Sequence, residues 1–76
     1  MMVVKIVHKK SKKDYYVRDV VRVLITRLDS KTNPQEVYRL KRKYKNGEET
    51  VTDIQMFHSD EYYIGEVYEE EEWMND

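Results

Sequence analysis

The residues best suited to chemistry in this chain form a dense cationic run in its middle: Arg39, Lys41, Arg42, Lys43 and Lys45. Cations at this density can neutralise the phosphates of a nucleic-acid backbone and release its condensed counterions. We therefore predict a non-catalytic binding module, a possible small regulator, that binds nucleic acid at these five residues. The alternative is a solvated surface whose cations pair with the protein's own carboxylates, an arrangement that contributes little to stability.

The charges of the chain are sorted along its length. All fourteen Lys and Arg lie at or before Lys45, and only four acids accompany them, so residues 1–45 carry a net charge of +10. Residues 46–76 hold eleven acids and no base, which gives −11 and a total of −1. If this sorting persists in space, the molecule has one cationic and one anionic surface. Such surfaces also permit self-association, including a homodimer.

The acidic second half ends in a run of carboxylates beside one large aromatic side chain. We expect one compact domain at residues 1–68 and an acidic tail at residues 69–76. The tail could present a phosphate mimic with an aromatic anchor to a basic groove on a partner protein. This protein-interaction or inhibitor role, of the phage or viral accessory type, is the alternative function. A solubilising tail is the commonest role of such a run. The candidate partner-binding residues are Glu69, Glu70, Glu71, Glu72 and Trp73.

No pattern in the chain indicates catalysis. Residues 58–60 are His-Ser-Asp, but consecutive residues cannot normally converge as base, nucleophile and orienting group. Two isolated histidines and no cysteine do not make a metal site, and two distant glycines do not make a phosphate-binding loop. We predict no enzyme activity, no cofactor and no metal. The lack of cysteine and of any long apolar run predicts a cytoplasmic protein with no membrane partner.

The elements that position these residues begin with a strand at residues 2–9, where β-branched residues alternate. Residues 12–28 are ambiguous. Five of the nine residues that begin at Val20 are β-branched, which is typical of a strand, yet each face of such a strand would carry a charged residue. The helical interpretation has Ser11 and Asp14 as an approximate capping box, and we favour it. Its apolar stripe is Val17, Val20, Val21, Leu24 and Leu28.

The cationic run lies in a second predicted helix, at residues 34–45. Asn33 is suited to cap this helix, Pro34 takes its first position and Glu36 completes a capping box. Gly47 lies where a left-handed C-terminal cap belongs.

The alternative for this region is a β-hairpin, with residues 37–44 and 50–57 as strands around Asn46-Gly47. A bulged turn that pairs Tyr44 with Glu48 would place Arg39 opposite Asp53, a favourable cross-strand pair.

Residues 49–57 and 61–68 are strands by composition, and we expect them to form an acidic hairpin packed against the basic helices. The predicted fold is α+β, in the order strand-helix-helix-hairpin. Over residues 12–68 this order is similar in outline to the winged helix-turn-helix family. The would-be wing has no Lys or Arg, so the resemblance implies that the second helix carries the binding. The alternative is an all-β protein, either a five-stranded meander or a small barrel.

Overall fold

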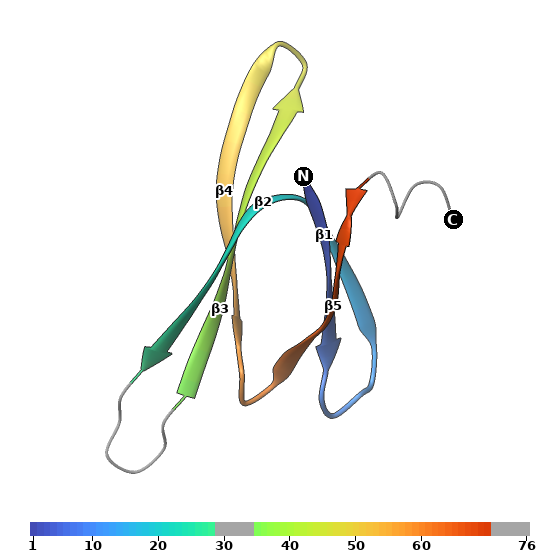
Figure 1. Cartoon of the computed structure of the whole chain (residues 1–76), viewed down its shortest axis with the longest axis vertical. Helices are drawn as coiled ribbons and strands as arrows, with labels where there is room; N and C mark the ends of the chain where they lie inside the picture. The colour runs from blue at the N-terminus through green and yellow to red at the C-terminus, as the bar shows by residue number, and fades with distance from the viewer. Residues whose placement is uncertain (29–34, 71–76) are drawn as a thin grey trace.

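The computed structural model describes residues 1–28 and 35–70, which form a single antiparallel sheet. Its strands are β1 (Met2–His8), β2 (Asp14–Leu28), β3 (Gln35–Asn46), β4 (Glu49–His58) and β5 (Tyr62–Glu69). They lie in the order β4-β3-β2-β1-β5. Figure 1 shows that the sheet is strongly curved: β2 crosses from a half shared with β3 and β4 to a half shared with β1 and β5.

The predicted α+β fold is wrong, because the described residues contain no helical element. The helices expected at residues 12–28 and 34–45 are β2 and β3, so the similarity to the winged helix-turn-helix family also fails. The all-β alternative fits, since β1 to β4 form a meander and β5 returns beside β1. The strands predicted at the two ends of the chain are confirmed, but β4 and β5 do not form a hairpin with each other.

Two irregularities in β2 explain why it resembled a helix. The register with β3 shifts between Val20 and Arg22, and the register with β1 shifts between Val17 and Val20. Asp19, within the second of these segments, has a left-handed φ of 60°. Each bulge inserts one residue and resets the alternation of the two faces. Val17 and Val20 are buried and Val23 is partly buried, so the inward-facing residues recur at intervals of three, a spacing that resembles a helical stripe in the sequence. Two residues of the predicted stripe, Val21 and Leu24, are instead exposed.

The β3–β4 hairpin closes with Asn46 opposite Glu49, so the loop consists of Gly47 and Glu48. Gly47 has a φ of 66°, the left-handed conformation that a tight hairpin turn requires at this position. Asp53 consequently lies opposite Arg42, whereas the hairpin predicted from the sequence placed it opposite Arg39. The observed register differs from the predicted one by three residues. A register shift by an odd number of residues exchanges the two faces of the strand. Asp53 therefore lies on the same side of the sheet as Arg42 and on the opposite side from Arg39.

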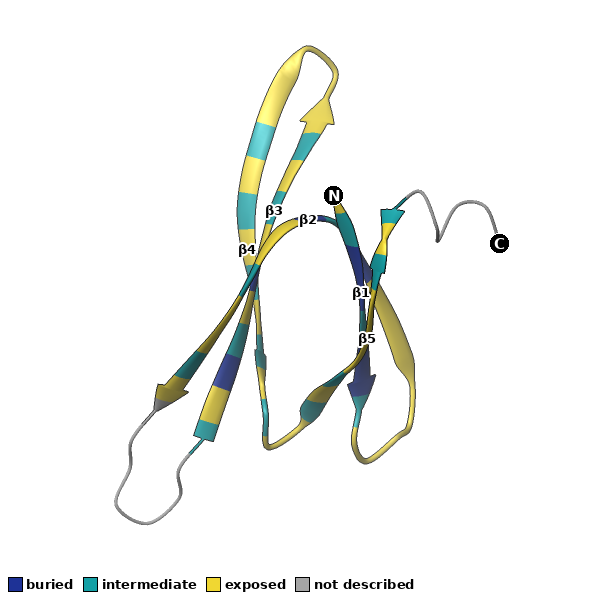
Figure 2. Ribbon diagram, in the orientation of Figure 1, coloured by how far each residue is buried: buried dark blue, intermediate teal, exposed yellow. Residues whose placement is uncertain are grey.

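The core lies inside the curve of the sheet. Figure 2 shows buried residues on β1, where β2 crosses the sheet and on the first part of β3, while the end of the β3–β4 hairpin is exposed. The buried cluster is Val4, Ile6, Val17, Val20 and Leu40, and the partly buried residues against it are Met2, Val23, Phe57, Tyr62 and Ile64. The interior is therefore made by residues of all five strands.

The turn between β4 and β5 is tied to β3 through Ser59. The Ser59 N–H donates to the Glu36 carbonyl at 2.9 Å, and the Ser59 hydroxyl oxygen accepts the Glu36 N–H at 2.9 Å. These two bonds hold the chain where it leaves β4 for β5. The serine of the His-Ser-Asp sequence thus has a structural role.

Candidate nucleic-acid interface

The face of β2, β3 and β4 that points away from the core carries a regular array of cations and aliphatic side chains. Opposite residues of antiparallel strands project to the same side of the sheet. The pairing therefore places two rows of three residues on this face: Arg22-Lys41-Ile54 and Leu24-Arg39-Met56. Five of these six residues line a shallow depression of about 210 Å³.

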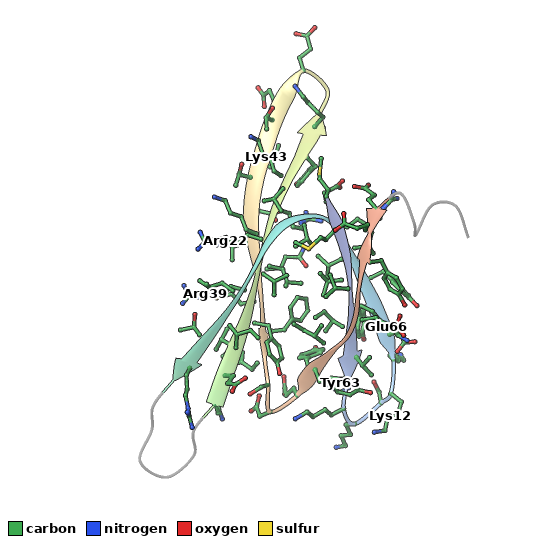
Figure 3. The ribbon with its side chains drawn as sticks, in the orientation of Figure 1. Lys12, Arg22, Arg39, Lys43, Tyr63 and Glu66 are labelled. Atoms are coloured by element: carbon green, nitrogen blue, oxygen red, sulfur yellow. The ribbon has the colours of Figure 1, made fainter. Side chains whose placement is uncertain are left out.

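Two more cations extend the array along β3 towards the hairpin. Lys43 lies opposite Thr52, and Lys45 lies opposite Thr50. Alternate residues of a strand are about 6.8 Å apart, so the β3 cations span roughly 20 Å. Figure 3 shows Arg22, Arg39 and Lys43 pointing outward on one side of the molecule, with Glu66 on the opposite side. We define the cationic face as Arg22, Arg39, Lys41, Lys43 and Lys45.

No residue of the cationic face forms an ion pair with a carboxylate in the described part of the chain. Arg22 and Lys41 even lie directly opposite each other, and like charges in that position destabilise a sheet. A polyanion bound on this face would relieve the repulsion. Ion pairs between described residues lie elsewhere, for example Lys5–Asp14 at 3.7 Å, Arg18–Glu70 at 3.7 Å and Arg42–Asp53 at 2.8 Å.

Comparison of the chain with protein-family models, with curated proteins and with solved structures found no match.

Arg42 is the one residue of the predicted basic run that lies on the inner side of the sheet. Its Nε and Nη2 atoms donate to the two carboxylate oxygens of Asp53, both at 2.8 Å, and its guanidinium lies 4.7 Å from the centre of the Tyr44 ring. The hydrogen bond from Arg42 lowers the pKa of Asp53, and the same bond raises the pKa of Arg42. Arg42 thus stabilises the hairpin from inside and does not join the cationic face.

The aliphatic residues of this face were not predicted as site residues, and neither was Arg22. Leu24 is 43% exposed, and Ile54 and Met56 are each 58% exposed. We call these three residues the aliphatic patch. A signal for them was present in the sequence, because a strand with Arg39, Lys41, Lys43 and Lys45 on one side pairs with a strand that has Ile54 and Met56 on the same side. Finding it required the strand assignment and the observed hairpin register.

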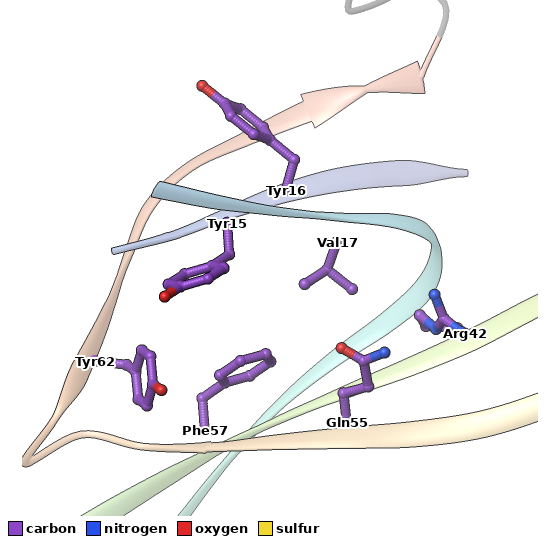
Figure 4. Close-up of a pocket in the computed structure, with 7 residues that line it drawn as sticks. All are labelled: Tyr15, Tyr16, Val17, Arg42, Gln55, Phe57 and Tyr62. Atoms are coloured by element: carbon purple, nitrogen blue, oxygen red, sulfur yellow. The ribbon is translucent and has the colours of Figure 1, made fainter. Parts of the chain in front are cut away.

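The inner side of the curve contains a cleft of about 380 Å³ between β2, β4 and the start of β5. Figure 4 shows Tyr15, Phe57 and Tyr62 turned towards one another across the cleft, whereas Tyr16 points away. The Tyr62 ring centre is 5.3 Å from that of Phe57 and 6.4 Å from that of Tyr15. The cleft extends the core, and its one cation, Arg42, is already engaged by Asp53.

His8 takes part in local contacts. His8 Nδ1 lies 2.8 Å from the Ser11 hydroxyl, and the His8 ring packs edge-on against Tyr62 at 5.0 Å. Within residues 1–28 and 35–70 no three His, Cys, Asp or Glu side chains are grouped as metal ligands would be. The same residues include no helix that could cross a membrane.

The predicted partner-binding residues begin at the end of β5. Glu69 lies opposite Met2. The Glu70 carboxylate is 3.7 Å from the Arg18 guanidinium, and its N–H donates to the Met1 carbonyl at 3.0 Å. Glu71, Glu72 and Trp73 lie outside the described residues. The role of this segment in binding a partner protein stays a prediction.

Proposed function

We propose that this protein binds nucleic acid without catalysis, through the cationic face of β2, β3 and β4. The observation that supports the proposal most strongly is the set of five cations held side by side with no carboxylate partner among the described residues. The binding surface is a sheet, in place of the helix expected from the sequence.

The spacing of the cations suits a phosphate backbone. A row of side chains about 6.8 Å apart on β3, with Arg22 one strand away, can follow a chain of phosphates over roughly 20 Å. Full engagement would neutralise about five phosphates and give a slope near −4.5 for log affinity against log salt concentration on duplex DNA. The binding is then largely independent of sequence, because phosphate contacts do not distinguish bases.

The chemistry of the face favours a duplex over a single strand. Proteins that hold single strands place aromatic rings under successive bases. The two central rows here carry aliphatic side chains, and the tyrosines of the described residues lie mostly in the inner cleft or on the β1–β5 half. A duplex needs no stacking platform, since its phosphates are presented from outside.

The test uses the full chain and a fluorescent duplex of about 20 base pairs at about 50 mM salt. The face variant replaces Arg39, Lys41 and Lys43 by Ala. Its matched control replaces Lys9, Lys10 and Lys13 by Ala, which removes the same charge from the exposed β1–β2 turn. We expect the face variant to lose most of its affinity and the control to keep it. Equal losses in the two variants, or no binding by the unaltered chain, would refute the proposal.

A further inference from the structure

We infer that the nucleic acid bound here is duplex DNA that the protein kinks from the minor-groove side, with Ile54 and Met56 entering between base pairs. This inference rests on the proposed function and specifies the ligand of the same face. It starts from the aliphatic patch, which the electrostatic account does not use.

The patch is contiguous and is bordered by cations. Ile54 lies opposite Lys41 and Met56 lies opposite Arg39, so each aliphatic side chain is one strand spacing, about 4.8 Å, from a cation. Isolated exposed aliphatic residues are ordinary, but a contiguous group rimmed by polar residues marks an interaction site. A rim of one charge sign selects a partner of the opposite sign, and DNA is the polyanion that also offers an apolar interior between its base pairs.

The position of the two residues allows them to reach that interior. They lie on β4, which pairs only with β3 and so forms an edge of the sheet. Where Ile54 and Met56 lie, the sheet has three strands, because Lys41 and Arg39 pair with β2 as well as with β4. This part is wider than the two-stranded ribbon that the major groove admits, and the minor groove is narrower still. The sheet must therefore lie across the duplex, and its side chains reach the bases only if the groove opens.

Architectural DNA-binding proteins open the minor groove in this way. They insert Ile, Leu, Met or Phe side chains at a base step, unstack it partly and bend the duplex away from the protein. The residue types and their cationic surroundings here match that chemistry. Base steps that unstack easily, such as TA, should be preferred, which adds a mild sequence preference to the phosphate contacts.

The experiment measures energy transfer between dyes at the two ends of a duplex of about 20 base pairs with a central TA step, saturated with the full chain. We expect a kink of between about 20° and 90°, seen as a rise in transfer efficiency. The Ile54→Ala/Met56→Ala variant should bind with the same salt slope but leave the duplex straight. The control variant Ile25→Ala/Val67→Ala removes two residues of similar exposure, 55% and 51%, that lie off this face. It should bend the duplex as the unaltered chain does.

The outcomes separate the inference from the proposed function. Tight, salt-dependent binding to a duplex that stays straight would overturn the inference and leave the proposed function standing. A bend that survives in the Ile54→Ala/Met56→Ala variant would overturn the inference, and so would tighter binding to the single strand. The inference would also be overturned if the control variant Ile25→Ala/Val67→Ala lost the bend. Duplex affinity that is unaffected by the changes at Arg39, Lys41 and Lys43 would overturn both.

Discussion

The two halves of the curved sheet treat charge and apolar surface in opposite ways. In the half formed by β1, β5 and the start of β2, cations on the strands have acidic partners: Lys5 is 3.7 Å from Asp14 and lies opposite Glu66. The lysines of this half that have no ion pair among the described residues lie in the β1–β2 turn. In the half formed by β2, β3 and β4, the outer cations have no acid partner among the described residues, and aliphatic side chains stand beside them in solvent. Under the proposed function, the first half stabilises the fold and the second half binds the ligand.

Burial supports the same division. β1 is buried on both faces, with Val3 and Val7 on one side and Val4 and Ile6 on the other. β4 has no fully buried residue, and exposed positions alternate along it with half-buried ones. Apart from Val37, which is buried, the outer side of β3 and β4 is largely exposed, so its residues can change at little cost to stability.

The sharpest test of this division is one substitution made in both halves. Ile6 is fully buried and Ile54 is 58% exposed. We expect Ile6→Ala to lower the free energy of unfolding by about 2–5 kcal/mol, through lost burial and the cavity left behind. Ile54→Ala should change it by less than about 0.5 kcal/mol. Urea unfolding followed by circular dichroism measures both, and similar losses at the two positions would erase the distinction.

A smaller effect is expected at the hairpin turn that joins β3 and β4. Gly47 has a φ of 66° with open space around it, so an added Cβ meets strain in the backbone and no neighbour. Gly47→Ala should cost about 1 kcal/mol of unfolding free energy. Gly47→Asn, the matched control, should cost less because Asn tolerates the left-handed conformation better. Equal thermal stability of all three proteins would show that the turn does not constrain the hairpin.

The smallest effect is expected from the inner ion pair of the same hairpin. The hydrogen bond from Arg42 lowers the pKa of Asp53 in the folded state, so its carboxylate stabilises the fold above the ordinary pKa of an aspartate. That contribution is lost as the pH falls through the lowered pKa. Asp53→Asn should therefore melt at a lower temperature than the unaltered chain at neutral pH, and the difference should shrink in acid.

The exposed Asp60 provides the control, since Asp60→Asn should melt like the unaltered chain at neutral pH. A gap between Asp53→Asn and the unaltered chain that widens in acid would contradict the assigned direction of the pKa shift.

Secondary structure was predicted correctly from the sequence near the two ends of the chain, but it was predicted wrongly at residues 12–28 and 34–45. Residues 2–9, 49–57 and 61–68 have the alternation and composition of strands, and β1, β4 and β5 confirm them. The helix predicted at residues 12–28 was wrong because the helical spacing of apolar residues was given more weight than the β-branched composition. In β2 the interval of three between core residues comes from bulges, and these depend on how β1 and β3 pair with it. Single-sequence periodicity has no access to that pairing.

The candidate site was predicted in part. Arg39, Lys41, Lys43 and Lys45 lie together on one face because they occupy alternate positions of a strand, a spacing visible in the sequence. Arg42 lies on the other side for the same reason. The contribution of Arg22 and of the aliphatic patch depends on strand order and register, which are tertiary properties.

The central claim is that the cationic face engages phosphates directly, and the salt dependence of duplex affinity tests it most directly. Between about 50 and 200 mM salt, log affinity of the unaltered chain should fall with a slope near −4.5. Replacing Arg39, Lys41 and Lys43 by Ala should bring that slope closer to zero by about 2.7, since each lost phosphate contact contributes about 0.9. Replacing Lys9, Lys10 and Lys13 should leave it unchanged. A slope that changes equally in the two variants, or in neither, would contradict the account.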